Sequence, residues 1–195
     1  MKPYLLGIDI GTSACKVAVF EKSGTVVAAA NGDYPVYYPK EGWAEQDPEE
    51  WWSAVCQAVK KAIQKAGIAP EEIAGIGIDG QSWSAIAMDK NGNVLTNTPI
   101  WMDTRAQSIC DRLNEEIGAE QIFEVSGNSL QPSYTTAKIL WYKENLPEVY
   151  QRIHKILQSN SYIAYKLTGV MSQDVSQGYG LHCFDMRKAA WEEDM

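Results

Sequence analysis

Short apolar runs separated by polar turns open the chain. The first run covers residues 4–8 and stops at Asp9, and a second run follows at 15–20 after a turn rich in glycine and hydroxyl groups. A polar turn at 22–25 then leads to a third run at 26–30. Apolar runs of this length between turn residues are typical of strands, so the pattern predicts three antiparallel strands in a meander.

A long amphipathic helix is predicted next. Residues 47–50 read Asp-Pro-Glu-Glu, which places an acid at the N-cap, proline at the first helical position and glutamate at the third. Apolar residues then recur at helical spacing, and Gly67 supplies the stop. The members of this apolar stripe are Trp51, Trp52, Val55, Val59, Ala62 and Ile63.

The apolar run at residues 73–79 predicts a buried strand. With the helix as the crossover, this strand can run parallel to the first one. Its two glycines, Gly75 and Gly77, indicate close packing against a helix. Beyond it we predict a hairpin over 85–95, because an Asn-Gly step favours a tight turn. The remaining predicted elements are a strand at 100–103 and helices at 104–118, 135–145, 148–158 and 160–167.

This order of strands brings two polar segments to one edge of the sheet. The turn after the first strand and the segment 79–84 both follow the carboxyl ends of neighbouring strands, where ligands of open α/β sheets bind. The two segments then flank one cleft. Asp9 closes a buried strand on one side of this cleft, where a carboxylate is costly unless it has a partner such as a metal ion.

The turn after Asp9 carries groups that suit a phosphate. Backbone N–H groups of residues 11–13 can surround phosphate oxygens, the hydroxyls of Thr12 and Ser13 can add hydrogen bonds, and Lys16 supplies positive charge. The simpler interpretation is that glycine, serine and threonine serve only the hairpin turn. Residue types alone leave both interpretations open.

Composition limits the class of protein. The chain has 195 residues, 45% of them hydrophobic, which is enough for one full domain or two small ones. Its net charge of -8 argues against nucleic acid and anionic membranes as partners. The four cysteines lie far apart without a C-x-x-C pair, so neither a zinc site nor a disulfide framework is predicted. No run has the character of a signal peptide or a membrane span, and we expect a cytoplasmic protein.

Six segments in one order give the chain a resemblance to a known family. They are G-I-D-I-G-T-S-x-x-K at 7–16, E-Q-D-P-E-E-W-W at 45–52, G-Q-S-W at 80–83, W-M-D-T-R at 101–105, P-S-Y-T-T-A-K-I-L-W at 132–141, and the segment 162–169, which ends in K-L-T-G. Together they resemble the FGGY carbohydrate kinases over essentially the whole chain. The resemblance implies an α/β fold of the ribonuclease H-like (actin-like ATPase) type. Such a domain has a mixed five-stranded sheet, with three antiparallel strands first and flanking helices.

The resemblance also implies a reaction, the transfer of the γ-phosphoryl group of ATP to a sugar hydroxyl with Mg2+. It assigns Asp9 to the magnesium shell, and Gly11, Thr12, Ser13 and Lys16 to the phosphates of ATP. The candidates for the sugar-binding wall are Gln81, Ser82, Trp83, Trp101, Asp103 and Arg105. For Asp103 and Arg105 a structural ion pair is the alternative. Tyr134 and Lys138 lie in a family segment, where a purely structural role is equally open.

Within the family the chain is most similar to the xylulokinases, which phosphorylate D-xylulose to D-xylulose 5-phosphate. They share the E-Q-D-P-x-x-W-W segment and a G-Q loop that contacts the sugar. The chain departs from them in this loop, because they typically read G-Q-M-H-G where residues 80–84 read G-Q-S-W-S. An indole in place of a hydrogen-bonding imidazole changes selectivity, so another pentulose, a polyol or glycerol is the alternative acceptor.

The family's second domain opens with a glycine-rich segment that holds the general-base aspartate, and no segment here matches it. We therefore expect residues 1–195 to be the N-terminal kinase domain, incomplete at its C-terminal end and without the second, ATP-side domain. Such a chain would be inactive alone, since phosphoryl transfer needs both walls of the cleft. A non-catalytic, actin-like nucleotide-binding module is the alternative, and a homodimer is left open. A small-molecule sugar is the expected partner.

Overall fold

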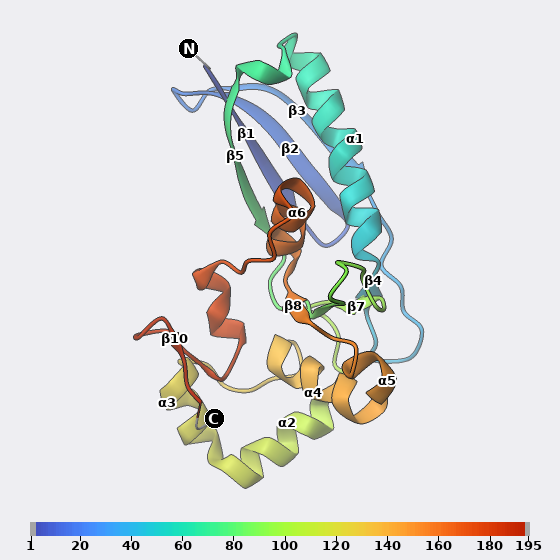
Figure 1. Cartoon of the computed structure of the whole chain (residues 1–195), viewed down its shortest axis with the longest axis vertical. Coiled ribbons are helices and arrows are strands. Elements are labelled where there is room, and N and C mark those ends of the chain that lie inside the picture. The colour runs from blue at the N-terminus through green and yellow to red at the C-terminus, as the bar shows by residue number, and fades with distance from the viewer. Residues whose placement is uncertain (1–2, 194–195) are drawn as a thin grey trace.

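Four strands form the main sheet of the computed structural model, which describes residues 3–193 (Figure 1). Their order is β3-β2-β1-β5, in which β2 pairs antiparallel with both β1 and β3, and β1 pairs parallel with β5. This arrangement confirms the predicted meander and the parallel strand that follows it. The bounds are Tyr4–Ile10 for β1, Ala14–Glu21 for β2, Val26–Asp33 for β3 and Ile73–Gly80 for β5.

Helix α1 (Pro48–Ala66) is the crossover and covers one face of this sheet (Figure 1). The carboxylate of Asp47 accepts a hydrogen bond from the N–H of Glu49 at the start of the helix, and Gly67 ends it in a left-handed conformation with φ of 67°. A short 3-10 helix, η1 (Pro70–Glu72), then leads into β5. Both ends of α1 lie where the capping signals predict them.

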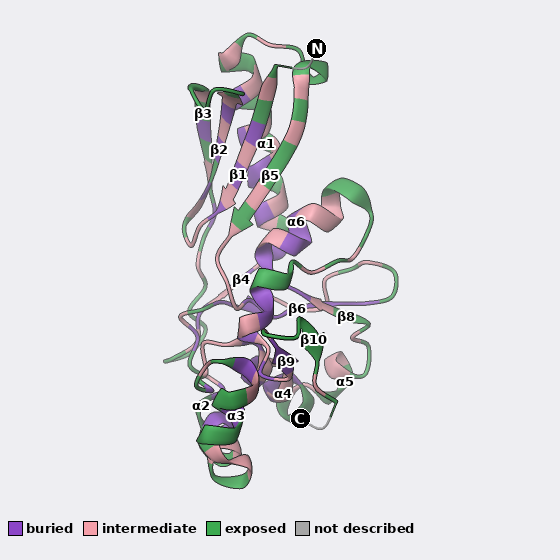
Figure 2. Ribbon diagram, turned by 90° about the vertical axis from the view of Figure 1, so that its left-hand side faces the viewer, coloured by how far each residue is buried: buried purple, intermediate pink, exposed green. Residues whose placement is uncertain are grey.

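The opposite face of the sheet is largely uncovered. Successive side chains of a strand point to opposite faces, so Ile8 and Val17 are buried against α1 whereas Leu5 is 41% exposed. Figure 2 shows exposed and intermediate residues along β5. A Cβ added at Gly77 would meet nothing within 4 Å, and one at Gly75 would meet only the side chain of Leu5. The prediction that these glycines pack against a helix is therefore wrong.

Within the described residues the main sheet has one strand fewer than the five that the resemblance implies. The chain leaves the sheet after β5, and the remaining short strands, β4 included, pair among themselves in two-stranded ladders. These pairs are β4 (Glu45–Gln46) with β7 (Thr98–Pro99), β6 (Ile86–Met88) with β8 (Lys155–Leu157), and β9 (Phe184–Asp185) with β10 (Ala190–Trp191). The predicted hairpin over 85–95 is confirmed by a bridge between Met88 and Val94.

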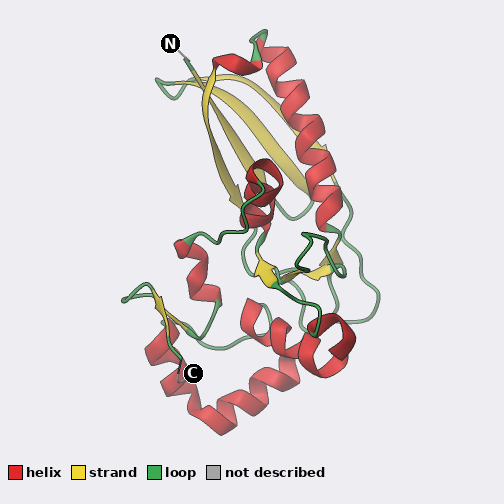
Figure 3. Cartoon of the chain, in the orientation of Figure 1, coloured by secondary structure: helices red, strands yellow, loops and turns green. Residues whose placement is uncertain are grey.

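Short helices form the other end of the molecule (Figure 3). Several of them pack around a second core, which includes Ile109, Ile122 and Trp141. The helices of this end are α2 (Gln107–Leu113), the π-helical turn η2 (Asn114–Gly118), α3 (Ala119–Ser126), α4 (Thr135–Asn145), α5 (Pro147–Tyr150) and the 3-10 helix η3 (Val175–Gly180). Helix α6 (Ser159–Thr168) lies instead beside the main sheet, in contact with β5 and α1. In residues 3–193 no helix has the length and apolar character that crossing a bilayer requires.

Two predicted elements are wrong because tertiary contacts outweigh the local pattern. Residues 100–103 form a turn closed by a hydrogen bond from the N–H of Asp103 to the carbonyl of Ile100, and α2 begins only at Gln107. The predicted helix over 148–158 stops at Tyr150, because the chain then extends to pair with β6. The N–H of His154 donates to the carbonyl of Met88 just before this pairing.

Candidate functional site

The turn between β1 and β2 is held from behind by buried and partly buried side chains. The hydroxyl of Tyr34 donates to the carbonyl of Gly11 at 2.6 Å, and the amide of Gln46 donates to the carbonyl of Thr12 at 2.8 Å. The N–H of Gly11 also donates to the carbonyl of Ala14 at 3.1 Å and closes the turn. These contacts fix the backbone of residues 11–13, so the predicted phosphate turn is a defined structure.

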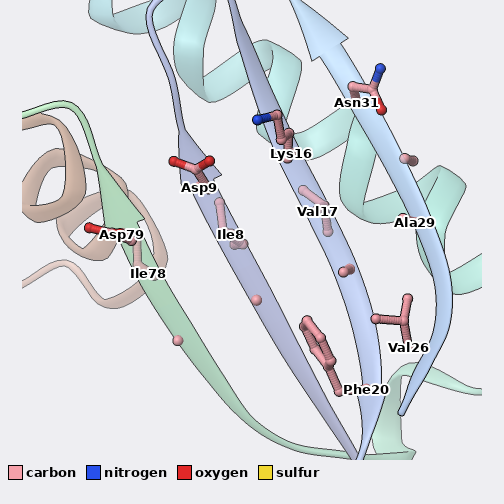
Figure 4. Close-up of a pocket in the computed structure, with 14 residues that line it drawn as sticks. Ile8, Asp9, Lys16, Val17, Phe20, Val26, Ala29, Asn31, Ile78 and Asp79 are labelled. Atoms are coloured by element: carbon pink, nitrogen blue, oxygen red, sulfur yellow. The ribbon is translucent and has the colours of Figure 1, made fainter. Parts of the chain in front are cut away.

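Polar side chains form a row across the uncovered face of the sheet, beside this turn. Lys16 of β2 pairs with Asn31 of β3 and with Asp9 of β1, and Asp9 pairs with Asp79 of β5. Figure 4 shows these side chains around a shallow pocket on the sheet. Among residues 3–193, neither the carboxylate of Asp9 nor the ammonium of Lys16 makes a hydrogen bond or an ion pair. Both groups are therefore available to a ligand.

The segment 80–84, which begins with the last residue of β5, lies against the phosphate turn and is called the sugar loop below after its predicted role. The N–H of Gln81 donates to the carbonyl of Ile10 at 2.8 Å, which extends the pairing of β5 with β1. The side-chain amide of Gln81 donates to Oε1 of Gln46 at 2.8 Å. Gln46, which is fully buried, thus binds the phosphate turn with its nitrogen and the sugar loop with its oxygen. The side-chain oxygen of Gln81 is buried without a partner in the described residues.

Trp101 joins the same assembly from the turn at residues 100–103. Its indole N–H donates to the hydroxyl of Thr12 at 3.0 Å, and its side chain stays 42% exposed. The phosphate turn, the sugar loop and Trp101 come from distant parts of the sequence, and the fold brings them to one edge of the sheet.

Trp83 in the sugar loop has a strained backbone and an aromatic surrounding. Its φ of 68° lies in the left-handed region, which costs a residue with a side chain about 1–2 kcal/mol. The N–H of Trp83 donates to the side chain of Gln158 at 2.8 Å, which helps to hold this conformation. The indole packs edge-on against Tyr134 at 4.6 Å and against Tyr179 at 5.9 Å. The indole nitrogen is buried and has no partner among the described residues.

Replacing Gly180 by alanine is expected to displace the Trp83 indole. A Cβ at Gly180 would lie 2.7 Å from an indole carbon of Trp83, so the ring must shift, at a cost of about 1–3 kcal/mol in unfolding free energy. Urea unfolding and the indole N–H signal of Trp83 in an NMR spectrum measure both effects. Gly77→Ala is the control, because its Cβ meets nothing within 4 Å. Equal behaviour of the two variants would contradict the placement of Trp83.

Asp103 and Arg105 form a buried ion pair instead of facing the exposed surface. The guanidinium of Arg105 donates to Asp103 at 2.8 Å and to Glu45 at 2.8 Å, and it stacks on the ring of Trp43 at 3.8 Å. Burial opposes the charged form of Arg105, but the hydrogen bonds to Asp103 and Glu45 outweigh it and raise the pKa of the guanidinium. This geometry favours the structural ion pair that the sequence left as the alternative.

The structure adds residues that the site candidates from the sequence do not include. Gln46 joins the phosphate turn and the sugar loop, Tyr34 supports the turn, and Gln158 and Tyr179 contact Trp83. The sequence offers one signal for Gln46, because this polar residue belongs to the segment E-Q-D-P-E-E-W-W, which matches the family. Tyr179 carries no such signal, because only the folding back of η3 brings it to the loop.

Comparison with known proteins agrees, over nearly the whole chain, with the family resemblance that the sequence motifs indicate. A family model for the N-terminal domain of the FGGY family of carbohydrate kinases matches residues 4–195. The chain belongs to this family. A xylulose kinase of Bacillus subtilis is 30% identical over 192 residues, which cover 98% of this chain and 38% of that protein. A glycerol kinase of Thermotoga maritima, named glycerol kinase 2, is 34% identical over 199 residues, which cover 98% of this chain and 40% of that protein.

Solved structures of FGGY sugar kinases share the fold. A xylulose kinase from Lactobacillus acidophilus, solved with a bound ligand, superposes with a TM-score of 0.91 at 30% identity, over 98% of this chain and 38% of that chain. A gluconate kinase from the same organism gives a TM-score of 0.91 at 30% identity over the same shares. These neighbours confirm the predicted actin-like α/β fold. The chain spans about two fifths of the length of the relatives that it matches.

Proposed function

We propose that this FGGY chain is the sugar-binding N-terminal part of an ATP-dependent kinase that phosphorylates a ketose, D-xylulose. The observation that carries the proposal is the pair of hydrogen bonds by which Gln46 joins the phosphate turn to the sugar loop. Phosphoryl transfer depends on holding the phosphate and the acceptor hydroxyl side by side. A shared edge of the sheet, with both segments fixed to one buried amide, supplies this arrangement.

In this proposal the phosphate turn binds the phosphates of ATP. Backbone N–H groups of Thr12 and Ser13, the hydroxyl of Ser13 and the ammonium of Lys16 would contact phosphate oxygens, while the N–H of Gly11 is used to close the turn. Asp9 would hold Mg2+, which neutralises charge on the phosphates when bound. The donor set fits this ion, since Mg2+ is commonly held by one or two carboxylates together with substrate phosphates. Among residues 3–193 there is no cluster of three or more metal-ligating side chains that would form a closed metal cage.

The sugar would bind beside Trp101. The unpartnered side-chain oxygen of Gln81 can accept a hydrogen bond from a sugar hydroxyl, and Ser82 and Trp83 extend the same wall. We assign Asp103 and Arg105 to the framework behind this wall, because both carboxylate oxygens of Asp103 are already occupied by donors. D-xylulose is supported by the names of several relatives. Glycerol or another polyol is the second candidate, supported by Trp83 and by the glycerol kinase relatives.

We further propose that the general base lies outside these residues. The matched relatives are more than twice as long as the chain, and the family resemblance implies an aspartate in a second domain. Residues 1–195 would then be an N-terminal domain that binds ligands without turnover. A cytoplasmic location remains a prediction of the sequence, and a homodimer is left open.

The test uses the chain itself with D-xylulose, L-xylulose, D-ribulose, gluconate and glycerol. NMR titration is expected to show saturable shifts of the indole N–H signals of Trp83 and Trp101 with D-xylulose, while Trp191 stays unchanged. Coupled measurement of ADP release is expected to show no turnover dependent on sugar. Shifts with glycerol but not with D-xylulose would favour the second candidate. Turnover by the chain alone would contradict the missing base, and an unchanged spectrum with every sugar would favour a non-catalytic module.

A further inference from the structure

Lys138 of α4 is a buried cation whose hydrogen-bond partners are all backbone carbonyls. The residue is 0% exposed, and its ammonium donates to the carbonyls of Ser133 at 2.6 Å, Trp83 at 2.7 Å and Ile100 at 2.8 Å. An ammonium group has three N–H donors, so each of them has one acceptor. No carboxylate of residues 3–193 lies within ion-pair distance of this nitrogen.

The three carbonyls belong to three segments that meet at the proposed sugar site. Trp83 lies in the sugar loop, and Ile100 directly precedes Trp101. Ser133 directly precedes Tyr134, whose ring packs against the indole of Trp83 at 4.6 Å. These segments come from separate parts of the sequence, and Lys138 hydrogen-bonds all three of them.

A cation in this position is costly because it is removed from water. Burial lowers the pKa of the Lys138 ammonium to about 7, the negative charge of Asp103 opposes this shift, and the positive charge of Arg105 adds to it. The segments that carry Trp83 and Ser133 present only carbonyl oxygens to the ammonium. An apolar residue would avoid this desolvation, but it would leave three buried carbonyls without a donor.

We propose that Lys138 is a positioning residue, whose ammonium holds the sugar loop, Trp101 and Tyr134 in one arrangement for the sugar. The assignment of this wall to a sugar rests on the proposed function, whereas the clamp itself does not. A neutral amine has two N–H donors and cannot bind all three carbonyls at once. Deprotonation of Lys138 therefore loosens at least one of the three segments.

A pH titration followed by NMR tests the clamp without any variant or ligand. The amide nitrogens of Ser84, Trp101 and Tyr134 adjoin the three carbonyls, and we expect their signals to move with one midpoint, equal to that of the Lys138 side-chain signal. His182 packs on Tyr134 at 5.2 Å, and burial lowers its pKa below the ordinary 6.5, so its titration falls at lower pH. Amide signals that do not move at the midpoint of Lys138 would overturn the clamp.

Variants separate the clamp from the proposed function. Lys138→Met is expected to abolish the shared titration and to weaken D-xylulose binding about tenfold or more, while Lys138→Arg, which keeps the charge, restores part of the affinity. Lys143→Met is the matched control, because Lys143 is exposed on the same helix. Retained affinity in Lys138→Met, with the amide signals of Ser84, Trp101 and Tyr134 still at their wild-type positions, would overturn the proposal. A wild-type chain that shows the shared titration but binds no sugar would leave the clamp in place and contradict the sugar site.

Discussion

Replacing Asp103 by alanine lowers the unfolding free energy by about 3–5 kcal/mol, the largest loss that we expect from a single polar side chain. The carboxylate is fully buried and accepts hydrogen bonds from the N–H of Ala44 at 2.7 Å and from the guanidinium of Arg105 at 2.8 Å. Its removal leaves Arg105 with Glu45 alone, and it removes the negative charge that offsets Lys138. Two buried cations then lose the anion that they share.

Asp185→Ala is the matched control for this measurement by urea unfolding. Asp185 is also buried, but its ion-pair partners Arg187 and Lys188 are exposed to water and stay solvated when the carboxylate is removed. We expect a clearly smaller loss there. If Asp103→Ala costs no more than Asp185→Ala, the buried charges do not form the framework that we assign to them. The loss of Asp103 also affects the site, because its carboxylate holds the N–H of Ala44, two residues before Gln46.

Replacing Asp9 by asparagine weakens the binding of magnesium triphosphate about tenfold or more, with little change in stability. The carboxylate has no partner among residues 3–193, so its loss removes no internal hydrogen bond. An amide keeps the shape of the side chain but lacks the charge that favours Mg2+, and a charge-assisted interaction is worth a factor of ten or more. Isothermal titration calorimetry with triphosphate and Mg2+ measures the affinity, and thermal unfolding measures the stability.

Asp79→Asn is the control for Asp9, since the two residues pair directly on neighbouring strands. The carboxylate of Asp79 accepts from the N–H of Gly80 at 2.8 Å and is not assigned to the phosphates. Its replacement is expected to leave the affinity within a factor of about two or three. Equal losses in both variants would point to the general negative charge of this face and contradict a specific role for Asp9.

Local signals in the sequence predict the part of the fold that carries the phosphate turn. The acid, proline and glycine around α1 set its ends, and apolar runs between turns set β1, β2 and β3. These signals act within a few residues, so they can be read without knowing the tertiary structure. The phosphate turn follows from them, because it is the link between the first two strands.

Contacts between distant segments decide the features that the sequence does not predict. Residues 155–157 carry a helical pattern but form β8, because β6 offers them a pairing partner. The local pattern at residues 100–103 predicts a strand, but these residues form a turn. The carbonyl of Ile100 in this turn accepts a hydrogen bond from the ammonium of Lys138, which is distant in the sequence. Gln46 joins the two halves of the site through hydrogen bonds to residues 34 and 35 positions away. No local pattern specifies such a link.

The central claim is that one site at the edge of the sheet holds a phosphate chain and a sugar side by side. An NMR titration of the chain with magnesium triphosphate, followed by D-xylulose in the same sample, tests it most directly. We expect triphosphate to shift the amide signals of residues 11–13 and the indole N–H signal of Trp101, which is hydrogen-bonded to Thr12. We expect D-xylulose to shift the side-chain N–H signals of Gln81, Trp83 and again Trp101. Triphosphate shifts that spare the turn, or sugar shifts that spare both Trp83 and Trp101, would contradict the account.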